Sequence, residues 1–470
     1  MRLVRTPPLV PNLTGPRTFV IGGAGSAPDP ALTPLRASLR LFVAAVAIRL
    51  AYCLAVVPLN PADPGAFDYF YASDGYCILA RTWYHDGKFA FHPDAPPTLF
   101  RTPGYVMPLV AAYALLGNMA LAATAVNCIA SALTCVLIHR AIAPIAPRAA
   151  RWSAWALALF PLSIHYCARS FDNTFITLTT TLFVVAALRM FALCRLHQGA
   201  LAGAALGLAI LTKPVALPFA LILPAFAAVG RRRALPAALL ATVVALLVVS
   251  PWTLRNYRVS GEFIPLGTGS AFNLLAGTYL ADTPGDSREA WQHTLRRIAQ
   301  SYEHCFRRPL DAASLRYGYF YDFTPAAERE FATLVKHSLA AEPWIWVKKP
   351  FINLARFWYY SSGNDKAAAS AALNVPMLVL AIIAGRRLLR RGEPEAKLLV
   401  PWLATFAACY VLIYAMINVH STRYSLPVLV WLAGLAPVGA AVVWHAARKN
   451  MAAAANSRSA IVSGPLSTDL

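Results

Sequence analysis

The sequence is poor in charge, and poorest in acidic charge. Only 13% of its 470 residues are charged, 21 Asp and Glu stand against 42 Lys and Arg, and 58% of the residues are hydrophobic. A chain of this length with so few polar side chains cannot cover a soluble core, and its apolar runs of about 20 residues are long enough to cross a bilayer. The shortage of charge therefore excludes an ordinary soluble protein and predicts an all-α polytopic membrane protein.

The sequence also lacks the spacings of a metal or redox site. Its eight cysteines include no Cys-x-x-Cys pair, and most of them fall inside apolar runs, where they serve as small apolar residues. His85 and His92 lie seven positions apart, which is not a zinc spacing. No cofactor is predicted with certainty, and a divalent metal held by carboxylates stays open as an alternative.

The excess of basic residues is arranged in short clusters between apolar runs. The net charge of +21 could suggest nucleic acid, but clusters separated by spans are typical of the cytoplasmic loops of a bacterial inner-membrane protein. We therefore expect membrane lipids, and no nucleic acid, as partners. The clusters are Arg140, Arg148 and Arg151; Arg189 and Arg195; Arg231, Arg232 and Arg233; Arg386, Arg387, Arg390 and Arg391; and Arg448 with Lys449.

Placing these clusters on the cytoplasmic side predicts about ten transmembrane helices. Two further apolar runs, 105–117 and 344–360, are expected to lie as interfacial or re-entrant helices on the outer face, because the first is short and basic residues interrupt the second. Whether either of them spans the membrane is left open. The ten expected spans are 37–58, 121–138, 152–165, 174–193, 200–211, 214–230, 234–250, 368–384, 398–416 and 426–446.

This topology divides the chain into five parts and leaves two extracytoplasmic loops. The first loop, 60–105, and the start of the second, 252–342, together hold fifteen of the 21 acidic residues, so we expect the chemistry on the outer face. The second loop shows no independent core and is interpreted as a lid on the bundle. The parts are a disordered cytoplasmic leader (1–36), an N-terminal bundle with the catalytic first loop (37–251), an extracytoplasmic cap with an interfacial helix (252–367), C-terminal transmembrane helices (368–446) and a cytoplasmic tail (447–470).

Two carboxylates on the outer face are candidates for catalysis. Asp74 precedes an amphipathic turn at the membrane edge, and Asp172 lies in a short external turn between two spans. A carboxylate in such a place can remove a proton from an acceptor or hold a divalent metal. The alternative for each is a helix N-cap, a common position for Asp.

Three cations are expected on the same face: Lys213, Arg255 and Arg423. A cation at the edge of a bilayer can bind an anionic lipid phosphate, and the guanidinium fork matches phosphate oxygens well. The alternative for each is an ordinary helix-end residue whose charged tip extends to the lipid headgroups.

Four sequence elements add to this interpretation by their order. They are Asp74-Gly75-Tyr76; Arg101-Thr102-Pro103-Gly104-Tyr105; Pro251-Trp252-x-x-Arg255-Asn256 with the downstream Asn273-Leu274-x-x-Gly277; and Arg423-Tyr424-x-Leu426-Pro427. Their order resembles the integral-membrane glycosyltransferases of the C-type fold. Within that fold the chain is similar to the dolichyl-phosphate-mannose protein mannosyltransferase and aminoarabinose transferase group, over about residues 41–446.

The resemblance implies a sugar donor carried on a polyprenyl phosphate, an extracytoplasmic acceptor (lipid, glycan or protein) and a site on the periplasmic face of the inner membrane. It implies that Asp74 is the catalytic carboxylate and that Asp172 has a second acidic role. Ser73 stands where members of the group often have a paired acid, which weakens the case for a metal at Asp74. The substrate-binding residues expected are Arg101, Lys213, Arg255, Asn256, Arg423 and Tyr424.

We expect an inverting reaction, in which Asp74 deprotonates the acceptor while Arg255, Arg423 and Lys213 stabilise the departing phosphate. One alternative is a lipid or polysaccharide transporter or flippase, which should show inverted repeats and ionisable residues in mid-span. The sequence shows no convincing repeat, and Arg49 is the one charge that seems deep in a span. Another alternative is a subunit that binds polyprenyl phosphate without catalysis.

Overall fold

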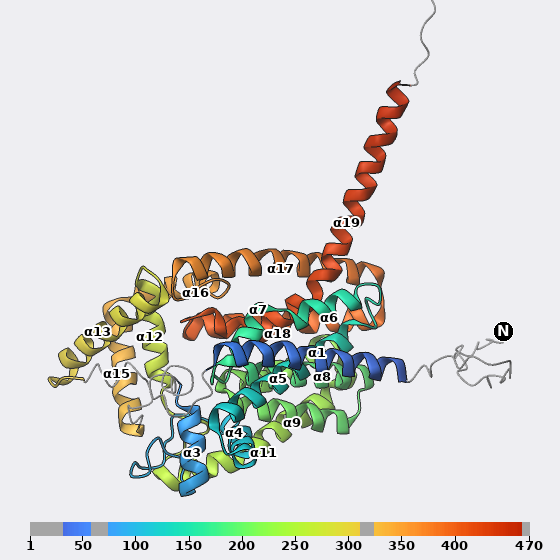
Figure 1. The fold of residues 1–470 in the computed structure, drawn as a ribbon. Helices are drawn as coiled ribbons and strands as arrows, with labels where there is room; N and C mark the ends of the chain where they lie inside the picture. Colours follow the sequence, from blue (N-terminus) through green and yellow to red (C-terminus); the bar gives the residue numbers. More distant parts are fainter. Residues whose placement is uncertain (1–31, 58–73, 311–323, 463–470) are drawn as a thin grey trace, which may run out of the picture.

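The computed structural model describes residues 32–57, 74–310 and 324–462, and every regular element among them is a helix. The expected leader lies almost wholly outside these residues, as do positions 60–73 of the first loop. The helices form an apolar bundle with a smaller group of helices at one end (Figure 1). The all-α fold class is therefore confirmed.

Seven of the described helices are long and apolar enough to cross a membrane, which makes the chain a multi-pass membrane protein. Helix α17 (Asn364–Arg391) runs along one side of the bundle in Figure 1, and the chain returns beside it in α18 (Pro394–Ile417). The seven are α1 (Leu32–Val56), α5 (Met119–Ile142), α8 (Asn173–Leu193), α11 (Leu235–Ser260), α17 (Asn364–Arg391), α18 (Pro394–Ile417) and α19 (Leu426–Val462).

The remaining three of the ten expected spans are shorter or interrupted. Two of them correspond to α9 (Leu196–Thr212) and α10 (Phe219–Gly230), which the 3-10 turn η3 (Pro214–Ala216) separates. The third, 152–165, is wrong as one continuous helix, because it is split into α6 (Ala150–Ala158) and α7 (Pro161–His165). A count of ten spans is therefore not confirmed.

Proline explains this break, and Arg49 stabilises it. Pro161 has no N–H to donate to the carbonyl of Leu157, four residues earlier. Arg49, which is fully buried, donates to that carbonyl at 3.3 Å and to the carbonyl of Ala158 at 3.0 Å, and also to the hydroxyl of Ser131 at 2.6 Å. The charge deep in α1 thus caps a broken helix from the side.

A second proline has the opposite outcome. The sequence predicted that a span would end at Ser250, but α11 continues through Pro251 to Ser260. Pro251 leaves the carbonyl of Leu247 without its helical donor, and the hydroxyl of Ser250 donates to it at 2.9 Å. Because the freed carbonyl has a local partner, the helix continues and carries Arg255 and Asn256 beyond the expected end of the span.

Helices α9 and α11 pack backbone against backbone through a row of glycines. Gly199, Gly203 and Gly207 are four residues apart and so lie on one face of α9. A Cβ at Gly203 would lie 2.4 Å from the carbonyl oxygen of Ala241, and one at Gly199 would lie 2.2 Å from that of Ala237. Small residues at such spacing let apolar helices approach closely in a bilayer.

The cap is formed by α12 (Ser270–Asp282), α13 (Ser287–Phe306), α15 (Pro325–Ala341) and α16 (Pro343–Arg356), on the left of Figure 1. The expectation that this region has no core of its own is wrong. Phe272, Leu275, Ile298 and Phe331 belong to a buried apolar cluster that lies apart from the core of the bundle.

The cap is also joined closely to the bundle. A Cβ at Gly277 of α12 would lie 2.1 Å from the carbonyl oxygen of Ile417, the last residue of α18. At the other end of α12, the Glu328 carboxylate accepts hydrogen bonds from the backbone N–H groups of Gly269 and Ala271. The first of these contacts accounts for Gly277 of the downstream sequence element.

The basic residues of α16 face the protein. Lys348 pairs with Asp282 at 2.5 Å, and buried Lys349 donates to the carbonyl of Leu274 and the hydroxyl of Thr278, both at 3.0 Å. Trp344, Val347 and Phe351 are exposed. An interfacial position for α16, and for the short apolar α4 (Val106–Leu116), stays a prediction.

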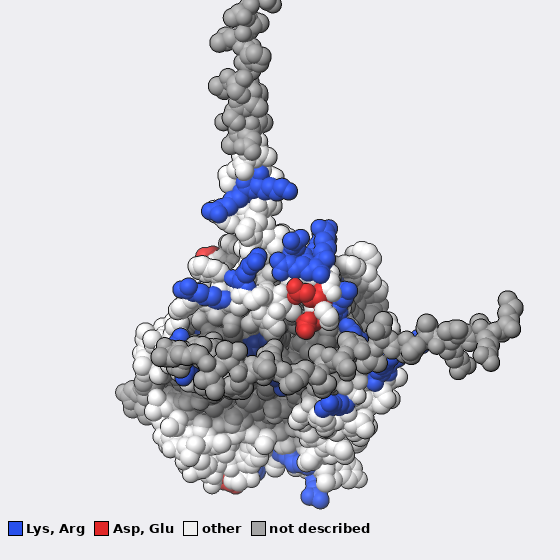
Figure 2. Space-filling model, turned by 90° about the vertical axis from the view of Figure 1, so that its right-hand side faces the viewer, with Lys and Arg blue, Asp and Glu red and all other residues white. Residues whose placement is uncertain are grey.

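The end of the bundle that faces away from the cap is basic. Figure 2 views this end and shows Lys and Arg side chains in several groups with few Asp or Glu side chains among them. One of these basic segments is the C-terminal end of α17, where Arg390 and Arg391 lie in the last turn. The charge distribution is that expected if this end is cytoplasmic.

Gly203→Ala is expected to destabilise the protein by about 1–3 kcal/mol, because the new methyl group must push α9 away from α11. Gly230→Ala is the matched control, since a Cβ there would meet no atom within 4 Å. Thermal or chemical unfolding of the two variants in detergent micelles measures the difference. Equal stabilities would contradict the close packing.

Candidate active site

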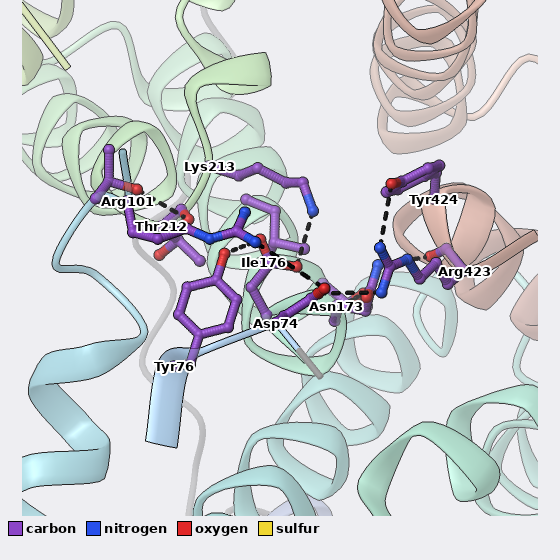
Figure 3. A network of polar contacts seen from close by, with 12 residues as sticks. Asp74, Tyr76, Arg101, Asn173, Ile176, Thr212, Lys213, Arg423 and Tyr424 are labelled. Carbon is purple, nitrogen blue, oxygen red and sulfur yellow. Dashed lines mark hydrogen bonds and ion pairs between the residues drawn. The ribbon is translucent and has the colours of Figure 1, made fainter. Parts of the chain in front are cut away.

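Asp74 lies at the entrance to α3 (Tyr76–Asp86), at the end of the bundle that carries the cap. The N-cap interpretation is wrong, because Gly75 occupies that position and no side chain caps the helix. The carboxylate instead accepts a hydrogen bond from Arg423, with 3.0 Å between Oδ2 and Nη1. Its other oxygen lies 4.0 Å from Nη2 of Arg101 (Figure 3). Asp74 therefore lies between two guanidinium groups.

Asp172 lies close by and is bound on both of its oxygens. It precedes α8 but makes no capping hydrogen bond with its side chain, so this N-cap interpretation is wrong too. Lys213 donates to Oδ1 at 2.8 Å, and the hydroxyl of Tyr76 donates to Oδ2 at 2.9 Å. Because Tyr76 belongs to α3, the same contact fixes the helix that follows Asp74.

A tight backbone contact places Arg101 beside Lys213. The N–H of Gly104 donates to the carbonyl of Leu211 at 2.8 Å, and the hydroxyl of Thr102 donates to that of Thr212 at 3.3 Å. A Cβ at Gly104 would lie only 2.5 Å from the backbone carbon of Leu211. The Arg-Thr-Pro-Gly element therefore docks against the end of α9.

Arg423 and Tyr424 come from the 3-10 turn η5 (Thr422–Ser425), just before α19. The carbonyl of Arg423 accepts from the side chain of Asn173 at 2.9 Å, which ties η5 to the start of α8. The guanidinium group lies over the ring of Phe171, 4.4 Å from its centre, and donates to the Tyr424 hydroxyl at 3.2 Å.

The site holds more positive than negative charge. Two carboxylates, Asp74 and Asp172, face three cations, Arg101, Lys213 and Arg423. The Nε atoms of Arg101 and Arg423 are buried, and neither has a hydrogen-bond acceptor within the described part of the chain. An unsatisfied buried donor costs about 1–3 kcal/mol, so the arrangement favours an anionic ligand.

The charges also determine the ionisation of Asp74. Burial alone would raise the pKa of this carboxyl, but Arg423, Arg101 and Lys213 outweigh burial and lower the pKa below its usual value. Asp74 is therefore ionised at neutral pH. With its charge already paired in this way, the carboxylate is a weak base.

Sequence reasoning missed the contacts of two residues around this cluster, Tyr76 and His420. Tyr76 was noted only as part of a motif, although it donates to Asp172. His420 packs edge-to-face against Trp291 of α13, with 4.9 Å between ring centres, and so links the cap to the segment before Arg423. Burial, and next the charge of Arg423, lower the pKa of His420 to about 4, so this imidazole is neutral. Only its position three residues before Arg423 could have indicated it.

Two expected substrate-binding residues have other partners. Arg255 donates to the carbonyl of Thr98 at 2.8 Å and stacks on Trp252, 4.7 Å from its ring centre. Asn256 is buried and donates to the carbonyls of Ile264 and Leu266, both at 3.1 Å. This element therefore joins α11 to two loops of the outer end. A role in substrate binding stays a prediction.

The described residues do not fit a divalent metal. Both oxygens of Asp172 accept hydrogen bonds, and those of Asp74 face two guanidinium groups. Within residues 32–57, 74–310 and 324–462, no three His, Cys, Asp or Glu side chains are grouped as ligands. A metal would have to displace the cations that now neutralise these carboxylates.

One family model matches the chain. The dolichyl-phosphate-mannose-protein mannosyltransferase family matches residues 101–254, a segment that contains Arg101, Asp172 and Lys213. No curated protein sequence matches the chain.

Solved structures match over most of the chain. The archaeal oligosaccharyltransferase AglB from Archaeoglobus fulgidus, in complex with an inhibitory peptide and a dolichol-phosphate, is 15% identical with a TM-score of 0.51; the match covers 88% of this chain and 51% of AglB. ArnT from Cupriavidus metallidurans, bound to undecaprenyl phosphate, is 19% identical with a TM-score of 0.38, over 87% of this chain and 77% of ArnT. The chain thus spans about half the length of AglB.

The chain has the fold of the C-type integral-membrane glycosyltransferases, as the sequence predicted. Within that fold class, the particular family it matches is that of the dolichyl-phosphate-mannose-protein mannosyltransferases, over the stretch from the Arg-Thr-Pro-Gly element to α11.

Gly104→Ala is expected to separate Arg101 from Lys213, because the added methyl group cannot fit against Leu211. Amide hydrogen exchange should become faster at 101–104 and 211–213, where the backbone contact is lost. Gly230→Ala, whose methyl group meets open space, should leave exchange in both segments unchanged. Unaltered exchange in Gly104→Ala would show that the docking does not depend on this glycine.

Asp74→Asn is expected to be less stable than the wild type at pH 7, and this difference should shrink towards pH 3. A folded-state pKa below the unfolded value stabilises the fold above the usual carboxyl pKa of about 4, and the contribution is lost as the pH falls through the folded-state pKa. Chemical unfolding at several pH values measures it. Asp94→Asn, at an exposed position, is the control; a difference for Asp74→Asn that stays constant with pH would contradict the ion pairing.

Proposed function

We propose that the protein is a glycosyltransferase that moves a sugar from a polyprenyl-phosphate donor to an extracytoplasmic acceptor, with inversion at the sugar. The observation that carries this proposal is the cluster of Asp74 with Arg101, Lys213 and Arg423 at the outer end of an apolar bundle. The cap at that end and the basic residues at the other support a site on the periplasmic face of a bacterial inner membrane.

The charge of the site suits a phosphodiester. Asp172 neutralises one of the three cations and Asp74 another, which leaves an excess of one positive charge. A sugar linked to a polyprenyl chain through one phosphate carries one negative charge. The buried Nε–H groups of Arg101 and Arg423, which have no acceptor among the described residues, are further donors for its oxygens. The apolar helices below the site are a suitable surface for the lipid chain.

The reaction balances with the residues present. A hydroxyl or amine of the acceptor gives its proton to the Asp74 carboxylate and forms a bond to the anomeric carbon from the face opposite the phosphate. The bond between that carbon and the phosphate oxygen breaks, and its electron pair leaves with the polyprenyl phosphate. Arg101, Lys213 and Arg423 stabilise the second negative charge that develops there, in surroundings of low dielectric constant.

Asp172 serves in this proposal as a positioning residue. Both of its oxygens are bound, so it is not free to accept a proton from substrate. It holds the ammonium group of Lys213 towards the cluster and fixes Tyr76 at the start of α3. The second acidic role that the resemblance implies for Asp172 is, in this proposal, to position Lys213 and Tyr76.

The cap is placed to select the acceptor. Trp291 reaches His420, three residues from Arg423, so α13 contributes to the surroundings of the site from the outer side. We propose that these residues bound the space for the acceptor. The sugar is a hexose or a pentose, and the acceptor is a lipid, a glycan or a protein.

Asp74→Asn is expected to lower sugar transfer at least about a hundredfold, because it removes the base. Membranes with matched amounts of wild-type or variant protein are supplied with radiolabelled polyprenyl-phosphate sugars, and label reaching an acceptor is counted. Asp282→Asn, which alters a paired carboxylate of the cap, should retain activity. Transfer by Asp74→Asn at the wild-type rate would sink the assignment, and donor translocation without transfer in either protein would favour a transporter.

A further inference from the structure

Asp74 and a donor phosphate require the same guanidinium group. In the structure Nη1 of Arg423 lies 3.0 Å from Asp74 and belongs to its nearest cation, whereas Arg101 lies 4.0 Å away. The proposed reaction needs Arg423 on the phosphate and Asp74 free to take a proton. In the structure Asp74 occupies Nη1 of Arg423, so a phosphate that takes this atom displaces the carboxylate from it.

The surroundings of Arg423 allow such a change without moving the backbone. The Asn173 side chain holds the carbonyl of Arg423, and the rings of Phe171 and Tyr424 lie beside the guanidinium group at 4.4 and 5.1 Å. Flat aromatic faces hold a guanidinium group but allow it to slide in its plane. Its Nε has no acceptor within the described residues, so a further anion satisfies a donor that is now unpaired.

We propose that Arg423 is shared between Asp74 and the phosphate of a polyprenyl-phosphate ligand: it pairs with Asp74 as in the structure, and it pairs with the phosphate when the ligand binds. This inference rests on the proposed function. Transfer of the guanidinium group to the phosphate releases Asp74 as a base at the moment when a sugar is present. Without a donor, Asp74 stays paired and cannot activate water or acceptor.

The other groups around Asp74 reinforce this exchange. Arg101 and Lys213 face it as further cations, and His420 faces it as a neutral imidazole. Both cations can also turn to the phosphate, Lys213 while still held by Asp172. The lipid phosphate brings negative charge next to Asp74, which further favours protonation of the carboxylate.

Linkage makes the exchange measurable without any turnover. If the phosphate and Asp74 compete for Arg423, removing the charge of Asp74 must strengthen phosphate binding. A variant that has lost its catalytic carboxylate should then bind the lipid more tightly than the active protein. A site in which Asp74 held a metal that bridges to phosphate would behave in the opposite way.

The test is the affinity of undecaprenyl phosphate for purified protein in detergent micelles, measured by native mass spectrometry. Asp74→Asn is expected to bind about tenfold more tightly than the wild type. Asp74→Ala carries the same expectation, so poor folding of one variant leaves the other. Asp282→Asn, in the cap, should bind like the wild type. Inorganic phosphate and undecaprenol are further ligands, and both should bind more weakly than the lipid phosphate.

A double substitution separates sharing from simple repulsion. In protein that carries Arg423→Gln, most of the gain from Asp74→Asn should disappear, because the guanidinium group nearest to Asp74 is gone and only the more distant Arg101 remains. A gain of the same size in that background would overturn the sharing of Arg423, as would equal or weaker binding by Asp74→Asn. Inorganic phosphate bound as tightly as undecaprenyl phosphate would overturn the lipid-borne ligand. Wild-type protein that binds no polyprenyl phosphate would overturn the proposed function itself.

Discussion

The ion pair between Asp74 and Arg423 is the interaction on which the arrangement of the outer end depends. It joins residues 349 positions apart, one before α3 and one before α19. The pair is partly buried, and beside it Asp172 accepts hydrogen bonds from both Tyr76 and Lys213, which form a second charged cluster. The two pairs bring the first loop, the start of α8, the end of α9 and η5 to one place.

Much of this could be predicted from the sequence, because apolar runs and isolated charges are local features. The membrane class and a shared face for Asp74, Asp172, Lys213 and Arg423 followed from such features, whereas the C-type fold followed from the resemblance of four ordered motifs to a known family. The pairing of each carboxylate with its cation did not, since it depends on how helices pack. Arg255 and Asn256 were expected at the cluster, but in the structure they bond to the carbonyls of other loops. Their position was mispredicted because the span was expected to end at Ser250, whereas α11 continues to Ser260.

The two prolines show why helix boundaries were harder to predict. Pro161 and Pro251 each remove one donor from an apolar run, yet α6 ends before the first and α11 continues past the second. The two sites differ in the donor that bonds to the freed carbonyl. Arg49, from a distant helix, donates to Leu157, whereas Ser250, beside the proline, donates to Leu247. A rule that treats each proline alike cannot tell them apart.

The contact between Gly277 and Ile417 restricts how the cap can move against the bundle. Because α12 touches the end of α18 through backbone atoms, with no side chain between them, the cap cannot rock against the bundle at this point without breaking the contact. The cap is therefore held rigidly against the bundle at this point. Under the proposed function, acceptors of different size are accommodated by different side chains along the edge of the cap, while the backbone contact with the bundle stays unchanged.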